Sequence, residues 1–178
     1  MADAVAAEAD LDGDGLIDWV GVVMDPPSDD AHPRHAQVFV LMRTQDGKLR
    51  LDSQSRAFAF LEGGGRNGFE IVDVPAPGQF VLQFNSRSVC AVNAVRYTFT
   101  RQSSEWRLSR LSREHADACD ATDDQTVEID YLTSRATLTE TRSGVRRTSN
   151  HRGRYGRYGL ADFDPTRPYG LDRFLFGQ

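Results

Sequence analysis

The chain has 178 residues, of which 39% are hydrophobic, and a formal net charge of -5 at pH 7. This length is enough for one domain with its own core, so we predict a single domain over residues 1–178. No stretch approaches the roughly 18 consecutive apolar residues of a membrane-spanning helix, and the acidic balance argues against a nucleic-acid partner.

The first motif is an Asp-rich stretch of nine residues, Asp-Leu-Asp-Gly-Asp-Gly-Leu-Ile-Asp, at 10–18. Carboxylates at alternate positions with a glycine at the sixth match a loop that supplies oxygen ligands to Ca²⁺. Gly15 suits the sharp turn because glycine takes positive φ without a Cβ clash. Without a cation the four carboxylates would repel one another, so we predict a calcium site instead of an acidic turn that binds nothing. The predicted ligands are the side chains of Asp10, Asp12, Asp14 and Asp18 and the carbonyl of Leu16.

The loop departs from a helical EF-hand at its end. An EF-hand closes with a bidentate Glu at position 12, but that position is Gly21 here. The run that follows, 19–24, is apolar and typical of a strand. A loop that leads into a strand resembles the calcium-binding blades of integrin-type propeller repeats.

Short strand patterns then recur along the chain, with turn signals between them. An Asp-Gly turn at 46–47 predicts a hairpin between the first two of these strands. The polar stretch 112–124 is predicted to be a loop, and no segment has sustained helical periodicity. This spacing predicts an all-β fold, either an antiparallel β-sandwich or a propeller-like sheet, with an N-terminal calcium loop. The predicted strands after the first are 37–43, 49–52, 56–61, 69–74, 79–85, 95–100, 106–111, 126–132 and 136–140.

The two ends are predicted to behave differently. Residues 1–9 are expected to be flexible, and they lack the charged and apolar regions of a signal peptide. We expect Met1 to begin a mature chain whose export signal is missing, and a lipid anchor on the precursor stays open. The tail 150–178 is rich in aromatic residues and is expected to pack partly on the sheet.

The cysteine count is even, with Cys90 and Cys119 as the two cysteines. One disulfide in an oxidising compartment fits this count and the calcium loop. Two buried free thiols are the alternative.

Charge is distributed unevenly along the chain. Residues 1–30 contain no Lys or Arg, whereas residues 141–160 contain six Arg and no acidic residue. This asymmetry predicts a bipolar surface suited to a charged partner. The alternative is that both segments are solvated ends.

The order of these features resembles a family of bacterial periplasmic proteins. The metal loop leads to a strand and an Asp-Gly hairpin, and a Gly-rich turn and Phe69-Glu70 follow. Then come Arg96-Tyr97-Thr98-Phe99, Trp106-Arg107-Leu108 and Ile129-Asp130-Tyr131-Leu132-Thr133. The best-known members are calcium-binding immunity proteins, similar in fold to periplasmic inhibitors of i-type lysozyme. They protect xanthomonad-type bacteria from peptidoglycan hydrolases injected by a secretion system.

The resemblance implies a periplasmic inhibitor that neutralises a lysozyme-like hydrolase by inserting loops into its active-site cleft. Such clefts carry paired carboxylates, which Arg engages well because its fork pairs bidentately. Inhibitors of this type use a Ser-Gly loop followed shortly by a Tyr. Here Ser143-Gly144 is followed by Arg146, and Tyr155 and Tyr158 are the candidates to replace that Tyr. A plain hairpin turn and a solvated basic arm are the alternatives for these segments.

Two other classes of function stay open. A calcium-stabilised binding or adhesion module for a glycan or surface protein explains the loop and the strands equally well. An enzyme ranks third because we find no catalytic motif outside the metal loop. We therefore predict a protein without enzymatic activity.

Overall fold

The structure is a computed structural model that describes residues 3–26, 33–60, 68–117, 119 and 124–175. Its regular structure is nearly all β. Sheet A contains β1 (Asp3–Ala9), β2 (Asp18–Met24), β3 (Arg34–Arg43), β4 (Leu49–Gln54) and β5 (Phe58–Phe60). Sheet B contains β6 (Gly68–Ala76), β7 (Gln79–Arg87), β8 (Ala91–Gln102), β9 (Glu105–Asp117), β10 (Asp124–Asp130), β11 (Arg135–Arg142) and β12 (Val145–Arg152). The tail holds a 3-10 turn, η1 (Leu160–Asp162), and one helical turn, α1 (Asp172–Leu175).

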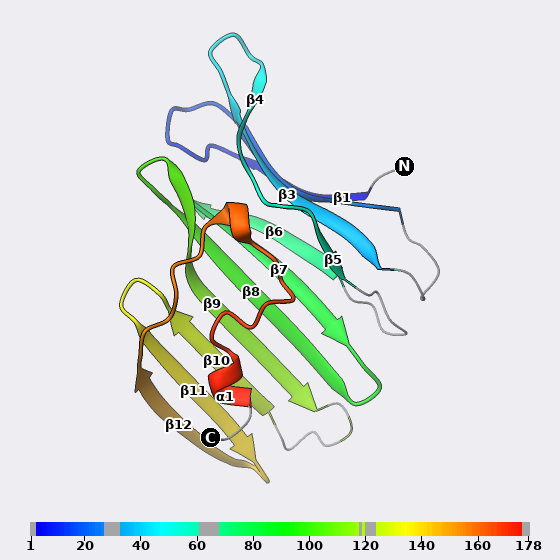
Figure 1. Ribbon diagram of the computed structural model, residues 1–178, viewed down its shortest axis with the longest axis vertical. Coiled ribbons are helices and arrows are strands. Elements are labelled where there is room, and N and C mark those ends of the chain that lie inside the picture. Colours follow the sequence, from blue (N-terminus) through cyan, green and yellow to red (C-terminus); the bar gives the residue numbers. More distant parts are fainter. Residues whose placement is uncertain (1–2, 27–32, 61–67, 118, 120–123, 176–178) are drawn as a thin grey trace.

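Both sheets are antiparallel throughout, which confirms the prediction of an all-β fold. Sheet A runs in the order β1-β2-β3-β4, with β5 also paired to β3. Sheet B is a meander in which each strand pairs with its neighbours in sequence, from β6 to β12. Sheet A lies at one end of the molecule over β6 and β7, and sheet B extends beyond it (Figure 1).

Alternating apolar residues build the core of sheet A. Val20 and Val22 of β2 and Val38 and Val40 of β3 are fully buried. Successive side chains of a strand point to opposite faces, so this period directs one row of each strand to the same side. That row packs on sheet B and forms one hydrophobic cluster with it.

An aromatic cluster joins the two sheets. The ring of Phe60 in β5 lies 5.5 Å from that of Phe84 in β7, and Phe58 lies 5.9 Å from Phe69 in β6. These tilted and edge-to-face arrangements are the favourable ones for aromatic pairs. The cluster therefore fixes β5 against the first strands of sheet B.

The C-terminal tail covers the part of sheet B that sheet A leaves open (Figure 1). It crosses the same face as sheet A, over β8 to β11. Its five buried residues contact the sheet or one another and belong to the common core. They are Tyr155, Leu160, Phe163, Tyr169 and Leu171.

Three predictions about elements need correction. Residues 3–9, expected to be flexible, form the paired strand β1, whose register with β2 runs from Asp3↔Met24 to Ala9↔Asp18. β9 continues to Asp117, so the predicted loop is wrong over 112–117. β12 was not predicted, because its residues are polar and all exposed. Residues 1–2, 118, 120–123 and 176–178 of these predictions lie outside the described residues.

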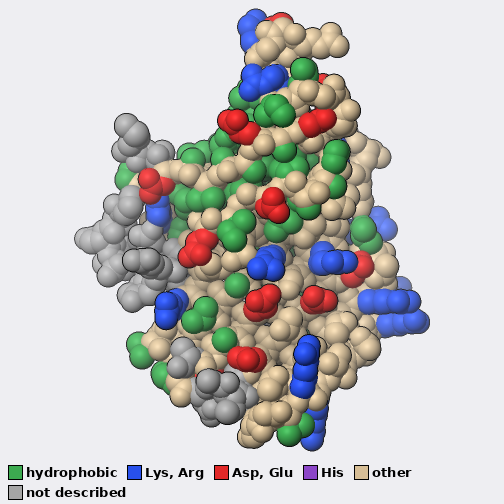
Figure 2. Space-filling model, turned by 180° about the vertical axis from the view of Figure 1, so that it is seen from behind, with side chains coloured by type: hydrophobic (Ala, Val, Ile, Leu, Met, Phe, Trp, Pro, Cys, Tyr) green, Lys and Arg blue, Asp and Glu red, His purple; other side chains and the backbone are tan. Residues whose placement is uncertain are grey.

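The face of sheet B that neither sheet A nor the tail covers is polar. Acidic and basic side chains are interspersed over it (Figure 2), as in the pair of Arg96 and Glu114 at 3.8 Å. Within the described residues, no helix has the length and apolarity needed to cross a membrane.

Cys90 and Cys119 form the predicted disulfide, with their Cα atoms 4.9 Å apart. The bond joins the turn before β8 to the segment after β9. A structural disulfide is typical of an oxidising, extracytoplasmic compartment.

Removing this disulfide should destabilise the protein by about 2–4 kcal/mol, because the unfolded chain regains the freedom of the loop between the two cysteines. A Cys90→Ser, Cys119→Ser double variant should therefore unfold at a lower urea concentration than the parent. Reducing agent should shift the parent to the same midpoint and leave the variant unchanged. Equal midpoints for parent and variant under oxidising conditions would contradict this.

Three tyrosines at the contact between the tail and sheet B should make the protein sensitive to alkali. Burial raises the pKa of Tyr97, Tyr131 and Tyr169 above the ordinary 10, and that of Tyr169 to about 12. The unfolded chain ionises at the ordinary pKa, so these three tyrosines should leave the free energy of unfolding unchanged below about pH 10. It should fall as pH rises from there through about 12, by about 2 kcal/mol for Tyr169.

Denaturant melts across this pH range measure the effect. The matched variant is Tyr169→Phe, which removes one ionisable phenol. Its stability should fall less steeply above pH 10 than that of the parent. Parallel curves for the two proteins would show that this phenol does not contribute.

Candidate metal site and partner-binding hairpin

The loop between β1 and β2 folds around the carboxylate of Asp10. Its Oδ1 accepts hydrogen bonds from the amides of Gly13 at 2.7 Å and Asp14 at 3.2 Å, and its Oδ2 accepts one from Gly15 at 2.9 Å. Gly13 and Gly15 both have φ of 85°, a conformation that favours glycine. The sequence Asp-x-x-Gly-x-Gly therefore folds this loop locally.

Asp18 anchors the other end of the loop, and its side chain is almost completely buried. Its Oδ2 accepts a hydrogen bond from the backbone amide of Leu11 at 2.8 Å, and its Oδ1 accepts one from the backbone amide of Arg43 at 2.7 Å. Each carboxylate oxygen has a second lone pair, so these bonds leave sites for a cation. Asp18 thus ties the loop to the end of β3.

Three of the four predicted carboxylates come together. Asp10, Asp12 and Asp18 each offer an oxygen, and these oxygens lie within 4.8 Å of one another. Asp14 is not part of this group, and its Oδ1 accepts a hydrogen bond from the amide of Leu16 at 2.8 Å. The group is compatible with a metal ion, and carboxylate oxygens are donors that hard cations prefer.

The negative charges are not balanced within the loop. Burial, and then the charges of Asp14 and Asp18, raise the pKa of Asp12, while the Asp14 amide and the Arg101 guanidinium oppose this shift. A carboxylate whose ionised form is disfavoured in this way gains from a nearby cation. The electrostatics therefore agree with the geometry of the group.

Sequence reasoning missed two residues that brace the loop. Arg101 of β8 lies 3.9 Å from Asp12 and 3.0 Å from Asp52 of β4. Asp52 also accepts a hydrogen bond from the indole of Trp106 at 2.9 Å. These residues come from distant strands, so no local spacing reveals them. The amide of Gly78, in the β6–β7 turn, adds a bond of 2.7 Å to the carbonyl of Leu11.

The other candidate site is the hairpin of β11 and β12. Ser143 and Gly144 are its two turn residues, with φ of 50° and 76°. Positive φ at both positions defines a type I′ turn, which matches the twist of the flanking strands. The turn lies at one end of the long axis of the molecule, and the metal loop lies in the opposite half (Figure 1). Arg146, next to the turn, is exposed.

The predicted tyrosines are not at this turn. The tail leaves β12 at Arg152, which pairs with Arg135 at the other end of the hairpin, about 20 Å or more from the turn. Tyr155 is buried against Tyr131 at 6.3 Å, and Tyr158 packs on Tyr169 at 4.8 Å. Both rings therefore serve the packing of the tail. The structure does not bring them together with Ser143 and Gly144.

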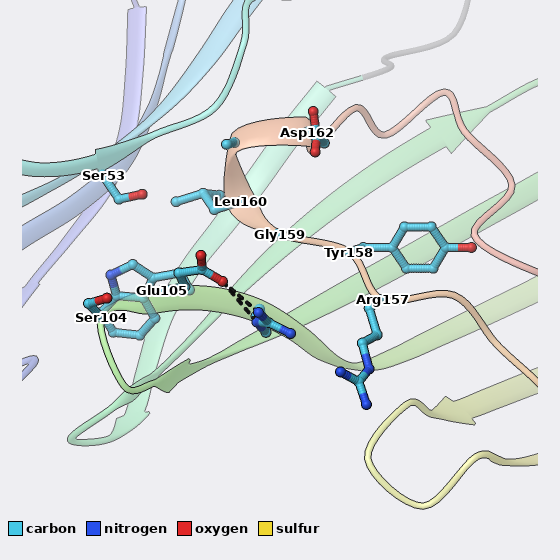
Figure 3. Close-up of a pocket in the computed structure, with 11 residues that line it drawn as sticks. Ser53, Ser104, Glu105, Arg157, Tyr158, Gly159, Leu160 and Asp162 are labelled. Carbon is cyan, nitrogen blue, oxygen red and sulfur yellow. Dashed lines mark hydrogen bonds and ion pairs between the residues drawn. The ribbon is translucent and has the colours of Figure 1, made fainter.

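A groove of about 320 Å³ follows the seam between β4, the β8–β9 hairpin and the tail. In Figure 3 Leu160 points toward Ser53, whereas Tyr158 points away from it. Glu105 accepts hydrogen bonds from Arg107 at 2.7 and 3.0 Å, and Asp162 lies 3.6 Å from Arg56. These charged groups pair with their neighbours, so the groove does not gather a set of reactive groups.

Comparisons with protein-family models, curated proteins and solved structures find no match for this chain. The fold and the site therefore define a class of protein and no particular family. The class is an all-β protein with two antiparallel sheets, one disulfide, and a group of aspartates arranged as for a metal ion.

Proposed function

We propose that the protein is a calcium-stabilised periplasmic inhibitor that protects a bacterium from a lysozyme-like peptidoglycan hydrolase. The observation that carries the proposal is the β11–β12 hairpin. It presents a type I′ turn at one end of the molecule, next to exposed arginines. The disulfide agrees with an exported protein, for which the periplasm is the compartment that contains peptidoglycan hydrolases.

Calcium has a structural role in this proposal. The carboxylates of Asp10, Asp12 and Asp18 would hold it between the start of β2 and the loop, where it would offset their mutual repulsion. Its ligands lie in the half of the molecule opposite the hairpin turn (Figure 1). Calcium would therefore raise stability without touching the hydrolase.

The hairpin supplies chemistry that suits a carboxylate-lined cleft. Arg142, Arg146 and Arg147 flank the turn, and all three are exposed. Arg142 is held by Glu140 at 3.2 Å, so Arg146 and Arg147 are the better candidates to reach a partner. A glycosidase cleft carries two catalytic carboxylates, and a guanidinium placed between them would block substrate access.

The test is turnover of purified peptidoglycan by a panel of lysozyme-like hydrolases, with this protein added at increasing concentration. Stoichiometric inhibition of one enzyme is expected. Arg146→Glu should weaken that inhibition by about tenfold or more, because it opposes like charges across the interface.

The matched control is Arg152→Glu, which makes the same charge change on the same strand about 20 Å from Arg146. It should leave inhibition within about twofold of the parent. Equal losses in both variants would indicate a diffuse charge effect and contradict insertion of the turn. Binding to a glycan array without inhibition of any hydrolase would favour a calcium-stabilised glycan-binding module instead.

A further inference from the structure

The outer edge of β12 is open. β12 is the last strand of sheet B and pairs on one side with β11, from Arg142↔Val145 to Arg135↔Arg152, without a register shift. All eight of its residues are exposed. Among the described residues, no strand pairs with its other side. The strand therefore presents a regular row of unpaired backbone groups.

The opposite edge of sheet B is protected in ways that β12 is not. β6 has register shifts between Phe69 and Ile71 and between Asp73 and Ala76, it contains Pro75, and β1 lies against it. Bulges, proline and covering segments are the usual means by which proteins block edge strands. β12 has no proline and no bulge, and charge is its only protection.

The turn fixes which backbone groups of β12 face outward. The residues that flank a two-residue turn form a hydrogen-bonded pair, and such pairs alternate with non-bonded pairs along an antiparallel ladder. Val145, Arg147, Ser149 and His151 therefore bond to β11. The amides and carbonyls of Arg146, Thr148, Asn150 and Arg152 are directed to the free edge.

The side chains decide which strand fits this edge. β12 carries Arg146, Arg147, His151 and Arg152 and no acidic residue. A second copy paired with it would place six arginines on two adjacent strands, and like charges opposite one another destabilise a ladder. An acidic strand would instead form cross-strand ion pairs at both ends of the edge, with Arg146 and Arg147 at one end and with Arg152 at the other.

We propose that the free edge of β12 binds an extended acidic segment of another protein by antiparallel or parallel strand addition. Backbone hydrogen bonds to the outward groups supply affinity, and the arginines select Asp or Glu at alternate positions. This surface adjoins the Ser143-Gly144 turn and shares Arg146 and Arg147 with it, but the inference does not depend on hydrolase inhibition. A hydrolase assay reports on the turn, whereas a peptide titration reports on the edge.

The probe is a blocked peptide of alternating Glu and Thr, equal in length to β12. Amide spectra of the ¹⁵N-labelled full chain should show saturable changes along β12 during titration. Exchange of the outward amides of Thr148 and Asn150 with solvent should slow on binding, because new hydrogen bonds protect them. A peptide of alternating Lys and Thr should not bind.

Two variants of one residue separate backbone pairing from charge. Thr148→Pro removes an outward amide, at an edge position where proline is tolerated, and should weaken binding by about tenfold. Thr148→Ala keeps the amide and should bind within about twofold of the parent. Both lose the contact of the Thr148 and Thr139 hydroxyls at 3.2 Å, so this loss cancels in the comparison.

N-methylation of the peptide tests the same bonds without altering the protein, and it should also weaken binding by about tenfold or more. The proposal is overturned by absence of saturable binding of the Glu-Thr peptide. It is also overturned if Thr148→Pro binds the Glu-Thr peptide as tightly as the parent protein does. The same holds if the parent protein binds the N-methylated peptide or the Lys-Thr peptide as tightly as the Glu-Thr peptide. Sedimentation of the free protein as a dimer that Thr148→Pro dissociates would show that a second copy occupies the edge instead.

Discussion

Replacement of Phe163 by alanine is expected to lower the free energy of unfolding by about 3–5 kcal/mol. The side chain is almost completely buried under the tail. Its ring lies 4.9 Å from Tyr97 and 5.3 Å from Phe99 in β8, and 5.8 Å from Phe58 in β5. Phe163 therefore contacts both sheets, and its loss would leave a cavity where the tail and the two sheets meet.

Urea unfolding followed by tryptophan fluorescence measures this effect. The matched control is Phe174→Ala, which makes the same truncation at a half-buried position in α1, where the ring lies 5.2 Å from that of His151. We expect the control to cost about 1 kcal/mol or less. Similar losses of stability in the two variants would show that Phe163 does not join the tail to the core of the two sheets.

The strands with strict alternation were predictable. In the predicted strand 95–100, alternation places Tyr97 and Phe99 on one face, and both are buried, while Arg96 on the other face is exposed. The Asp46-Gly47 turn is also a local signal, and Gly47 has the positive φ of 81° that it implies. In these cases the side chains that decide the structure are neighbours in sequence.

β1 and β12 were missed because tertiary pairing, and not local pattern, makes them strands. β1 is rich in alanine; it pairs with β2 and also lies against β6 of the other sheet. β12 has one apolar residue, Val145, and depends on its ladder with β11. The Ser143-Gly144 dipeptide was a usable signal for this hairpin, since both residues tolerate positive φ better than bulky ones.

The candidate metal site also contains residues that the sequence predicts and residues that it does not. The spacing of Asp10, Asp12 and Asp18 was readable because the loop folds on its own carboxylates. Arg101 and Asp52 were not, because long-range strand pairing brings them to the loop. Asp14 shows the limit of the spacing, since its carboxylate turns to a backbone amide.

Replacement of Asp18 by alanine is expected to lower the free energy of unfolding by about 3–9 kcal/mol in the presence of calcium. The buried amide of Leu11 and the partly buried amide of Arg43 would lose their acceptor, at about 1–3 kcal/mol each. The proposed calcium would also be lost, and at ten to a hundred times its dissociation constant it contributes about 1.4–2.7 kcal/mol. Thermal melts with calcium and with a chelator measure both parts.

Asp12→Ala separates the metal from the fold, because the Asp12 side chain is exposed and accepts a hydrogen bond of 3.2 Å from Asp14. It should abolish the calcium-dependent rise in melting temperature and change the melting temperature in chelator by only a few degrees.

Asp14→Ala decides between a site that uses all four aspartates of the nine-residue motif and a site formed by the three-carboxylate group. If calcium still raises its melting temperature as in the parent, the site is the group of Asp10, Asp12 and Asp18. If the rise disappears, Asp14 must turn inward when calcium binds. A full calcium response in Asp12→Ala would contradict the proposed site, because Asp12 is one of the three carboxylates that form the group.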